Sequence, residues 1–105
     1  MIYLASPYTH PDPLIRELRY LQALKVCAAR LKAGQMIYSP IVHCHDMAKV
    51  FGLPKDISFW RPYNFHMIDL SEEFKILRLD GWEASQGIAE EKTYAEEQDI
   101  PVTYL

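Results

Sequence analysis

The sequence has only two cysteines in 105 residues, Cys27 and Cys44. They are too few and too far apart for the disulfide framework of a small secreted domain or for a four-ligand zinc site. No apolar run approaches the ~18 residues of a transmembrane helix. The first residues, MIYLASPY, also lack the basic lead-in and long apolar stretch of a signal peptide. We therefore expect reduced thiols and a cytoplasmic protein with no membrane partner.

Clustered positive charge is also missing. Eleven Lys and Arg residues are scattered among fourteen Asp and Glu, which gives a formal net charge of −3. A surface that follows a nucleic-acid backbone needs its basic residues gathered in a patch or stripe, so nucleic acid is not an expected partner. The Walker A, G-x-G-x-x-G and G-x-S-x-G motifs are absent as well. Their absence removes the usual patterns for ATP binding, dinucleotide binding and serine-hydrolase chemistry.

Short apolar runs alternate with helical patterns along the chain. Asp12 followed by Pro13 predicts a helix start, because Asp caps the free amides and proline fits the first helical position. Leucines recur at spacings of three and four along this helix, charged residues occupy its other side, and Gly34 ends it. Residues 41–54 show no clean period and are predicted to be loop with a short helix. The predicted strands are 2–5, 36–39, 74–79 and 101–105, and the predicted helices are 13–32, 57–70 and 86–97.

This alternation of strands and helices predicts parallel strand pairing. The expected fold is α/β, a three-layer sandwich with a parallel sheet of four or five strands. Residues 1–105 form one domain, too short for a separate substrate domain, so a deep site is expected to need a second copy of the chain. Within residues 2–5, Tyr3 and Ala5 share one face of the strand, opposite Ile2 and Leu4.

The most informative stretch is LDGWEASQGIAEE, residues 79–91, where a strand breaks into a turn and a helix begins. Ser85 in the capping position leaves the next backbone amides free, and the helix dipole favours an anion there. Gly87 and Glu91 are four residues apart and therefore share one helix face. The pattern predicts a binding floor with a carboxylate beside it, although a plain surface helix with a solvated Glu91 fits these residues too.

Ligands of parallel α/β sheets bind beyond the carboxyl ends of the strands. Three loops are expected to meet there, namely residues 6–8, 39–43 and 80–87. The candidate binding residues that they contribute are Ser6, Pro7, Tyr8, Ser39, His43, Asp80, Trp82, Ser85 and Gly87.

Metal and thiol chemistry are weaker hypotheses. His43, Cys44, His45 and Asp46 are all possible ligands, but they are adjacent in sequence and no CxxC or HExxH cluster completes a site. No metal site is predicted, and His43 stays a candidate only as a lone pocket residue. Cys44 as a nucleophile would need surroundings that stabilise a thiolate.

A carboxylate nucleophile is the remaining chemistry. Glutamate can attack an anomeric carbon and form a covalent glycosyl intermediate, which divides one difficult displacement into two easier steps. Tyr3 could orient that carboxylate through its hydroxyl, or serve only as a core aromatic. Trp60 and Trp82 are candidates for stacking on a base, although core packing is the commoner role of tryptophan.

The motifs IYLASPY, LKAG, MIYSPIVHCH, FWRPYN, ILRLDGWEASQGIAEE and PVTYL span nearly the whole chain. Together they resemble the nucleoside 2-deoxyribosyltransferase superfamily, in particular its short branch of DUF1937 type, which is related to nucleotide N-glycosidases. The resemblance implies a Rossmann-like fold in a homodimer or higher homo-oligomer, with a neighbouring subunit completing the pocket. It also implies cleavage or exchange of an N-glycosidic bond in a small nucleotide or nucleoside, with no cofactor.

Position by position, the resemblance implies that Glu91 is the nucleophile, in a frame S-x-G-x-x-x-E. Tyr3 matches the tyrosine that orients it, and Ser6, with its two neighbours, lies in the loop that lines the sugar or phosphate side. Ser85 matches the serine that the nucleotide-cleaving branch places beside a 5′-phosphate, where a carboxylate would repel the ligand. The expected substrate is therefore a nucleoside 5′-monophosphate.

Asn64 departs from the family pattern, which has an aspartate in this part of FWRPYN to serve the sugar or the departing base. An amide can hold a hydroxyl but cannot supply a proton at neutral pH. Asp69 lies about 140° further round a helix, so Asp80 is the better placed acid. The same departure favours an alternative function, that of a non-catalytic module that binds or senses a nucleotide.

Overall fold

The computed structural model describes residues 1–105 and has four parallel strands in one sheet. The strand order is β2-β1-β3-β4, and β1 pairs with both β2 and β3. The strands are β1 (Ile2–Ala5), β2 (Ile37–Tyr38), β3 (Glu73–Ile76) and β4 (Val102–Tyr104). The helices are α1 (Pro13–Lys32), α2 (Pro40–Phe51), α3 (Ile57–Asp69) and α4 (Gln86–Glu97), with a 3-10 turn η1 (Trp82–Ala84) before α4.

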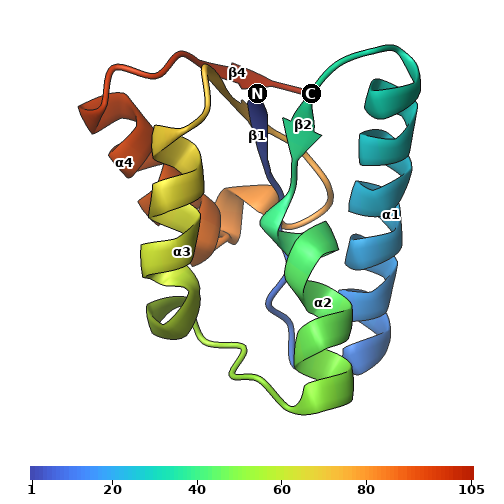
Figure 1. Cartoon of the computed structure of the whole chain (residues 1–105). Helices are drawn as coiled ribbons and strands as arrows, with labels where there is room; N and C mark the ends of the chain where they lie inside the picture. The colour runs from blue at the N-terminus through green and yellow to red at the C-terminus, as the bar shows by residue number, and fades with distance from the viewer.

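The helices cover both faces of the sheet. Helices α1 and α2 lie on one side of the strands and α3 and α4 on the other (Figure 1). This arrangement is a Rossmann-like three-layer sandwich, so the predicted fold class is confirmed, with four strands. None of the helices is long and apolar enough to cross a membrane.

Alternation along β1 sends side chains into two separate cores, as predicted. Tyr3 and Ala5 pack with Phe74 and Ile76 and with residues of α3 and α4. Leu4 packs with Cys27 of α1 and with Leu77. Because strand side chains alternate between faces, two residues on each face suffice to anchor β1 to both helical layers.

Both predicted helix starts that depend on capping are confirmed. The Asp12 carboxylate accepts a hydrogen bond from the Leu14 amide at 2.9 Å, with Pro13 in the first turn of α1. The Ser85 hydroxyl accepts one from the Ile88 amide at 3.2 Å at the start of α4. These side chains satisfy amides that have no partner within the helix.

The prediction for residues 41–54 was wrong, because α2 is a full helix from Pro40 to Phe51. Ser39 caps it by accepting from the Val42 amide at 3.2 Å, and Gly52 ends it in the left-handed conformation with φ of 68°. Start and stop signals were therefore present in the sequence. The helical period was obscured because a polar residue, His45, is buried on the inner face of this helix.

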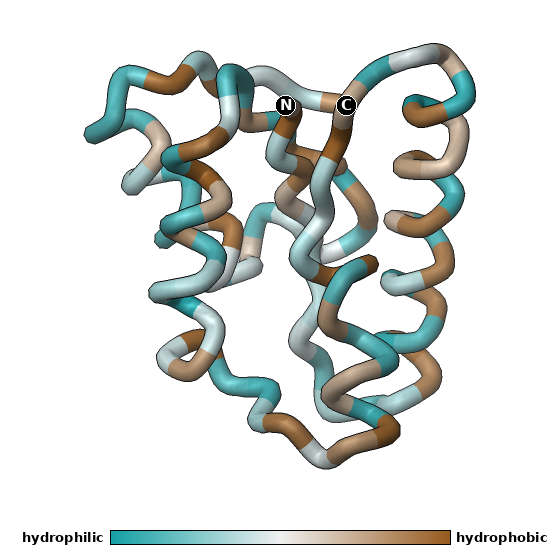
Figure 2. The backbone as a smooth tube through the Cα atoms, viewed as in Figure 1, coloured by the Kyte–Doolittle hydropathy of each residue, from teal (hydrophilic) through white to brown (hydrophobic).

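Helix α1 also differs from a simple amphipathic helix. The residues that it buries are small, Ala23 and Cys27. Its leucines lie largely in solvent, with Leu14 77% exposed and Leu31 57% exposed. Hydrophobic segments recur along the length of this helix in Figure 2. The regular leucine spacing therefore marks a face that the chain itself does not cover.

Candidate active site

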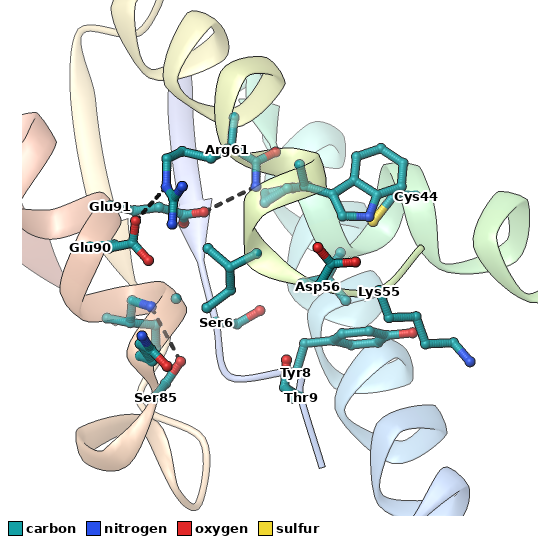
Figure 3. Close-up of a pocket in the computed structure, with 18 of the residues that line it drawn as sticks. Ser6, Tyr8, Thr9, Cys44, Lys55, Asp56, Arg61, Ser85, Glu90 and Glu91 are labelled. Carbon is teal, nitrogen blue, oxygen red and sulfur yellow. Dashed lines mark hydrogen bonds and ion pairs between the residues drawn. The ribbon is translucent and has the colours of Figure 1, made fainter. Parts of the chain in front are cut away.

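A cavity of about 650 Å³ opens at the carboxyl ends of the strands. This volume is in the usual range for small-molecule sites. Its wall comes from the loop after β1, from α2 and α3, and from the segment that leads into α4 (Figure 3). The predicted convergence holds for the loop after β1 and the segment before α4, whereas residues 39–43 are the start of α2 and reach the wall only through Pro40 and Ile41. Seven of the candidate residues line the cavity, namely Ser6, Tyr8, Trp60, Asn64, Ser85, Gly87 and Glu91.

Glu91, on the second turn of α4, contributes its carboxylate to the cavity wall. The side-chain amide of Asn64, from α3, donates a hydrogen bond to Glu91 Oε2 at 3.1 Å. Burial raises the pKa of Glu91 to about 7, although the nearby Tyr3 hydroxyl and the hydrogen bond from Asn64 lower it, and the charge of Glu90 adds to the rise. At neutral pH the Glu91 side chain is therefore partly protonated and partly ionised. Such a group is suited to proton-coupled chemistry.

Tyr3 is close to Glu91 and is completely buried. Its ring stacks on Phe74, with centroids 5.4 Å apart. Burial, and then the neighbouring Glu91, raise the pKa of the Tyr3 hydroxyl well above its usual value. The hydroxyl is close enough to act on Glu91, yet it has no well-formed hydrogen bond with any group. Tyr3 is thus both a core aromatic and a neighbour of the carboxylate.

Four buried polar side-chain atoms around the cavity have no hydrogen-bond partner in the protein. They are the hydroxyls of Tyr3, Ser6 and Tyr38 and the Oδ1 of Asn64. Buried polar atoms are nearly always paired, so each unpaired one calls for an explanation. Three of them belong to β1, its following loop and β2, and the fourth to the facing helix α3. Of these residues, Ser6 and Asn64 line the cavity, so their unpaired oxygen atoms are the ones that a polar ligand there could engage.

The start of α4 forms another part of the wall. Ser85 and Gly87 both line the cavity, so the first free amides of the helix lie beside it. A methyl group on Gly87 would lie 3.9 Å from Ser85 Oγ, an ordinary contact. The fold therefore does not need glycine here, and the bare backbone leaves room for a ligand.

Arg19 of α1 also lines the cavity, although no local sequence pattern indicates it. Its guanidinium donates hydrogen bonds to the carbonyl oxygens of Thr9, at 3.0 Å, and Asp80, at 3.2 Å. Gly81 has φ of 89°, and a methyl group on it would lie 2.6 Å from Arg19 Nη2. This glycine therefore allows a positive charge to approach the turn before α4.

Besides Tyr3, five candidate residues lie outside the cavity wall, namely Pro7, Ser39, His43, Asp80 and Trp82. Pro7 and Ser39 are buried, and Ser39 is engaged as the cap of α2. His43 stacks on Tyr63 with ring centroids 5.5 Å apart. Asp80 is exposed and contributes only a carbonyl oxygen, to Arg19.

The two tryptophans have different surroundings. Trp60 lines the cavity, and its indole N–H donates to the Pro54 carbonyl at 2.7 Å. Trp82, in η1, packs against the core and lies edge-on to Tyr104, with centroids 5.7 Å apart. Only Trp60 is therefore placed to contact a ligand.

Cys44 lines the cavity from α2, but burial raises the pKa of its thiol to about 11. It is therefore a thiol at neutral pH, and a thiolate nucleophile is not favoured. Three or more His, Cys, Asp or Glu side chains are nowhere grouped so that they could hold a metal ion. The neighbours of Cys44 in sequence point to separate partners along the helix.

His45, also on α2, joins a chain of polar contacts that the sequence did not reveal. Its Nδ1 lies 2.7 Å from the Tyr8 hydroxyl, and its Nε2 lies 2.7 Å from Glu17 Oε2. Lys49 Nζ lies 3.4 Å from the same carboxylate oxygen. A buried imidazole is thereby linked to a surface carboxylate on one side and to a cavity residue on the other.

At the opposite wall, Arg61 Nε donates to Glu90 Oε1 at 2.5 Å. In Figure 3 this pair and Glu91 lie on one side of the cavity, whereas Tyr8, Lys55 and Cys44 lie on the other. A ligand that spans the cavity would thus meet carboxyl groups at one end and hydroxyl, thiol and ammonium groups at the other.

The family model described as "Domain of unknown function (DUF1937)" matches residues 1–105. No curated protein matches the chain. Because the family match covers the whole chain, this protein belongs to the DUF1937 family.

Proposed function

We propose that this protein cleaves the N-glycosidic bond of a nucleoside 5′-monophosphate, as a nucleotide N-glycosidase or deoxyribosyltransferase-like enzyme. One observation carries the proposal. The Glu91 carboxyl faces a cavity of ligand size, holds a pKa near 7, and lies one helical turn from the anion-favouring start of α4. The sequence resemblance to the nucleoside 2-deoxyribosyltransferase superfamily leads to the same residue.

The phosphate end is assigned to the start of α4. Ser85 and Gly87 offer a hydroxyl and free amides at the positive end of the helix dipole. Arg19 adds a guanidinium to the same wall, and Arg–phosphate contacts are among the stronger charge-assisted hydrogen bonds. A nucleoside without a phosphate would leave these groups unused, which is why we favour the monophosphate.

The attack occurs at C1′ of the sugar. A Glu91 carboxylate oxygen forms a bond to C1′ while the bond from C1′ to the base nitrogen breaks, and a covalent glycosyl intermediate results. Water or a second base then attacks C1′ and restores the carboxylate. This displacement needs no cofactor. Asn64 positions the carboxyl through its hydrogen bond, with Tyr3 close by, and the unpaired Oδ1 of Asn64 is available to the sugar.

The base lies at the other end of the cavity in this proposal. The wall between α2 and α3 includes Ile41, Ala48, Ile57 and Trp60, which are suited to a flat heterocycle. Ordering the ligand in this way places C1′ between the base and the phosphate, next to Glu91.

We further propose that the protein works as a homodimer or higher oligomer in the cytoplasm. The leucine face of α1, defined by Leu14, Leu18, Leu21, Leu24 and Leu31, is exposed in the single chain. Several exposed leucines along one helix are typical of an interface. Both cysteines are free, as expected for a reducing compartment.

The test is base release. The purified protein is incubated with ribo- and deoxyribonucleoside 5′-monophosphates and with the matching nucleosides, and free base is followed by chromatography. We expect release from at least one monophosphate and slower release from its nucleoside. If no base is released from any monophosphate at enzyme concentrations near those of the substrate, the proposed function is wrong.

Glu91→Gln is the matched variant, because it keeps the shape and the hydrogen bond to Asn64 but cannot attack. Base release should fall below detection in Glu91→Gln while the fold and ligand affinity persist. Glu90→Gln, next to it on α4, changes the same charge without removing the proposed nucleophile, and should retain release.

A second function has its own supporting observation. Asn64 stands where the related enzymes have an acid and holds Glu91 in a hydrogen bond, so the site resembles one that binds without turnover. Under this alternative the protein senses or sequesters a nucleotide. Calorimetric binding of a monophosphate that is recovered intact after long incubation would select this function over the enzyme.

A further inference from the structure

The contacts of His45 form a continuous path from the cavity to the surface. Tyr8 lines the cavity, its hydroxyl meets His45 Nδ1 at 2.7 Å, and His45 Nε2 meets Glu17 Oε2 at 2.7 Å. Both ring nitrogens are thus engaged. An imidazole with a carboxylate on one nitrogen and a hydroxyl on the other is the usual arrangement for moving a proton.

The contacts between Tyr8, His45 and Glu17 are held in place by the packing around His45. His45 is only 4% exposed, and its ring is stacked on Tyr20 with centroids 4.1 Å apart. The hydrogen bond from His45 lowers the pKa of Glu17, so this carboxylate stays ionised. The imidazole is thereby fixed in one orientation, with its Nδ1 toward Tyr8.

The proposed reaction needs a proton at the departing base, which Asn64 cannot supply and which Tyr3, outside the cavity wall, is not placed to deliver. A departing base carries negative charge unless it is protonated, and Asn64 has no acidic proton. Among the cavity acids, Glu90 pairs with Arg61, and the Ser58 hydroxyl lowers the pKa of Asp56 so that it is ionised. Of the side chains on the proposed base side, Tyr8 is the one joined to an internal proton source.

We propose that Tyr8 protonates the departing base and regains its proton from His45, which Glu17 holds in place. This inference rests on the proposed function and names the acid that the function requires. Tyr8 is the catalytic residue, because it contacts the ligand. His45 and Glu17 act through it as positioning and proton-supplying residues.

The protons and bonds balance over the two steps. The proposed starting state has a proton on each nitrogen of His45, with Nε2–H directed to Glu17, Nδ1–H directed to Tyr8, and the Tyr8 O–H directed into the cavity. As the bond from C1′ to the base nitrogen breaks and the bond from C1′ to Glu91 forms, the Tyr8 proton passes to the base. The Nδ1 proton passes to Tyr8 at the same time.

In the second step water attacks C1′ and the bond to Glu91 breaks, which restores the carboxylate. The proton that water loses passes to Tyr8, and the proton of Tyr8 returns to His45 Nδ1. The net reaction is nucleotide plus water giving free base and sugar phosphate. No oxidant, reductant or further reactant is needed.

The experiment compares two leaving groups on one sugar phosphate. The first is the natural base, which needs a proton to depart. The second is 4-nitrophenolate, a weak base that departs without one. We expect Tyr8→Phe to slow release of the natural base by about 10²–10⁴-fold, the usual contribution of a general acid. Release of 4-nitrophenolate should change by no more than a few-fold.

His45→Asn should give the same pattern, because it leaves a group to hold Tyr8 but none that carries an ionisable proton. The matched control is Tyr20→Phe, which removes the hydroxyl of the other aromatic residue that contacts His45. Tyr20 stacks on the imidazole but does not line the cavity, so both leaving groups should be released at wild-type rates.

The outcomes separate the two claims. If the wild-type protein releases 4-nitrophenolate and base, and Tyr8→Phe slows both equally, the relay is wrong and the glycosidase stands. Lys55 and His10 line the same cavity. If Lys55→Met or His10→Ala, and not Tyr8→Phe, slows release of the natural base while leaving release of 4-nitrophenolate unchanged, the relay is also wrong. If the wild-type protein releases neither group, the proposed function fails and the relay fails with it.

Discussion

Asn64 and Glu91 lie 27 residues apart in sequence and meet at the cavity, where the Asn64 amide donates to Glu91 Oε2 at 3.1 Å. The Oδ1 oxygen of the Asn64 side chain is buried and unpaired. An aspartate at this position would turn a hydrogen bond into a contact between two carboxyl groups. The chemistry of the site therefore depends strongly on this one amide.

Replacing Asn64 by aspartate should couple its titration to that of Glu91. Two carboxyl groups within hydrogen-bond distance cannot both ionise easily, so they share one proton and one apparent pKa of the pair rises well above 7. Carboxyl carbon NMR over a pH series would measure both apparent values. Two independent titrations, each with an unchanged pKa, would contradict the close contact between these residues.

The pH dependence of stability follows from the raised pKa of Glu91. Between pH 4.5 and about 7 the folded chain binds more protons at this site than the unfolded chain, so the free energy of unfolding falls as pH rises. At about 1.4 kcal/mol per pKa unit, the loss is about 3 kcal/mol by pH 8. Denaturant unfolding at pH 5 and pH 8 would measure it.

Glu91→Gln is the control for this effect, because the amide resembles the neutral acid and cannot ionise. We expect wild type and Glu91→Gln to have similar stability at pH 5. At pH 8 the variant should be the more stable by up to about 3 kcal/mol. Equal stability at both values of pH would mean that Glu91 titrates as an ordinary exposed glutamate.

Much of the fold follows from local patterns in the sequence. Apolar alternation assigned Tyr3 and Leu4 to opposite faces, and a cap residue before an acidic helix located the start of α4 at Ser85. The rule for carboxyl ends of parallel strands then located the cavity between the loop after β1, the start of α2 and the segment before α4. Each of these inferences depends on residues that are close together in sequence.

The parts that were missed depend on contacts between distant residues. Arg19 reaches the Asp80 carbonyl across 61 residues, and His45 reaches Glu17 across 28. No residue near them in sequence indicates such pairs. In α2, the buried His45 also interrupts the apolar period by which a helix is recognised. The full extent of α2 and the Tyr8–His45–Glu17 path were hidden for the same reason.

Tyr3→Phe separates the two roles of this tyrosine. The Tyr3 hydroxyl is buried without a hydrogen-bond partner. Removing a buried hydroxyl that has a partner usually costs about 1 kcal/mol of stability. Because this hydroxyl has none, Tyr3→Phe should be at least as stable as wild type. The pKa of Glu91 should rise further, because Tyr3 lowers it in the wild type. Thermal unfolding and the NMR titration of Glu91 would measure both effects. A large loss of stability would show that the hydroxyl has a partner after all.

Leu21→Lys tests the exposed leucine face of α1. Leu21 is 50% exposed in the single chain, so a lysine there should not disturb the fold of a monomer. If copies pair through this face, the buried charge opposes pairing and sedimentation should show a shift from oligomer to monomer. Lys25→Leu on the same helix is the opposite change and should favour association. A wild-type monomer at high concentration would contradict the interface.

Gly87→Ala distinguishes the needs of the fold from those of a ligand. Gly87 lies within α4, and an added methyl group would make only an ordinary 3.9 Å contact with Ser85 Oγ. Alanine is the better helix former, so stability should rise by about 0.5–1 kcal/mol. Affinity for a nucleoside monophosphate should fall by about tenfold or more, which is at least about 1.4 kcal/mol, because the methyl group occupies space beside the free amides. Calorimetry and thermal unfolding on the same preparations would measure the two effects. If the variant is more stable but binds the nucleoside monophosphate as tightly as wild type, the phosphate does not lie beside Gly87 and must bind elsewhere in the cavity.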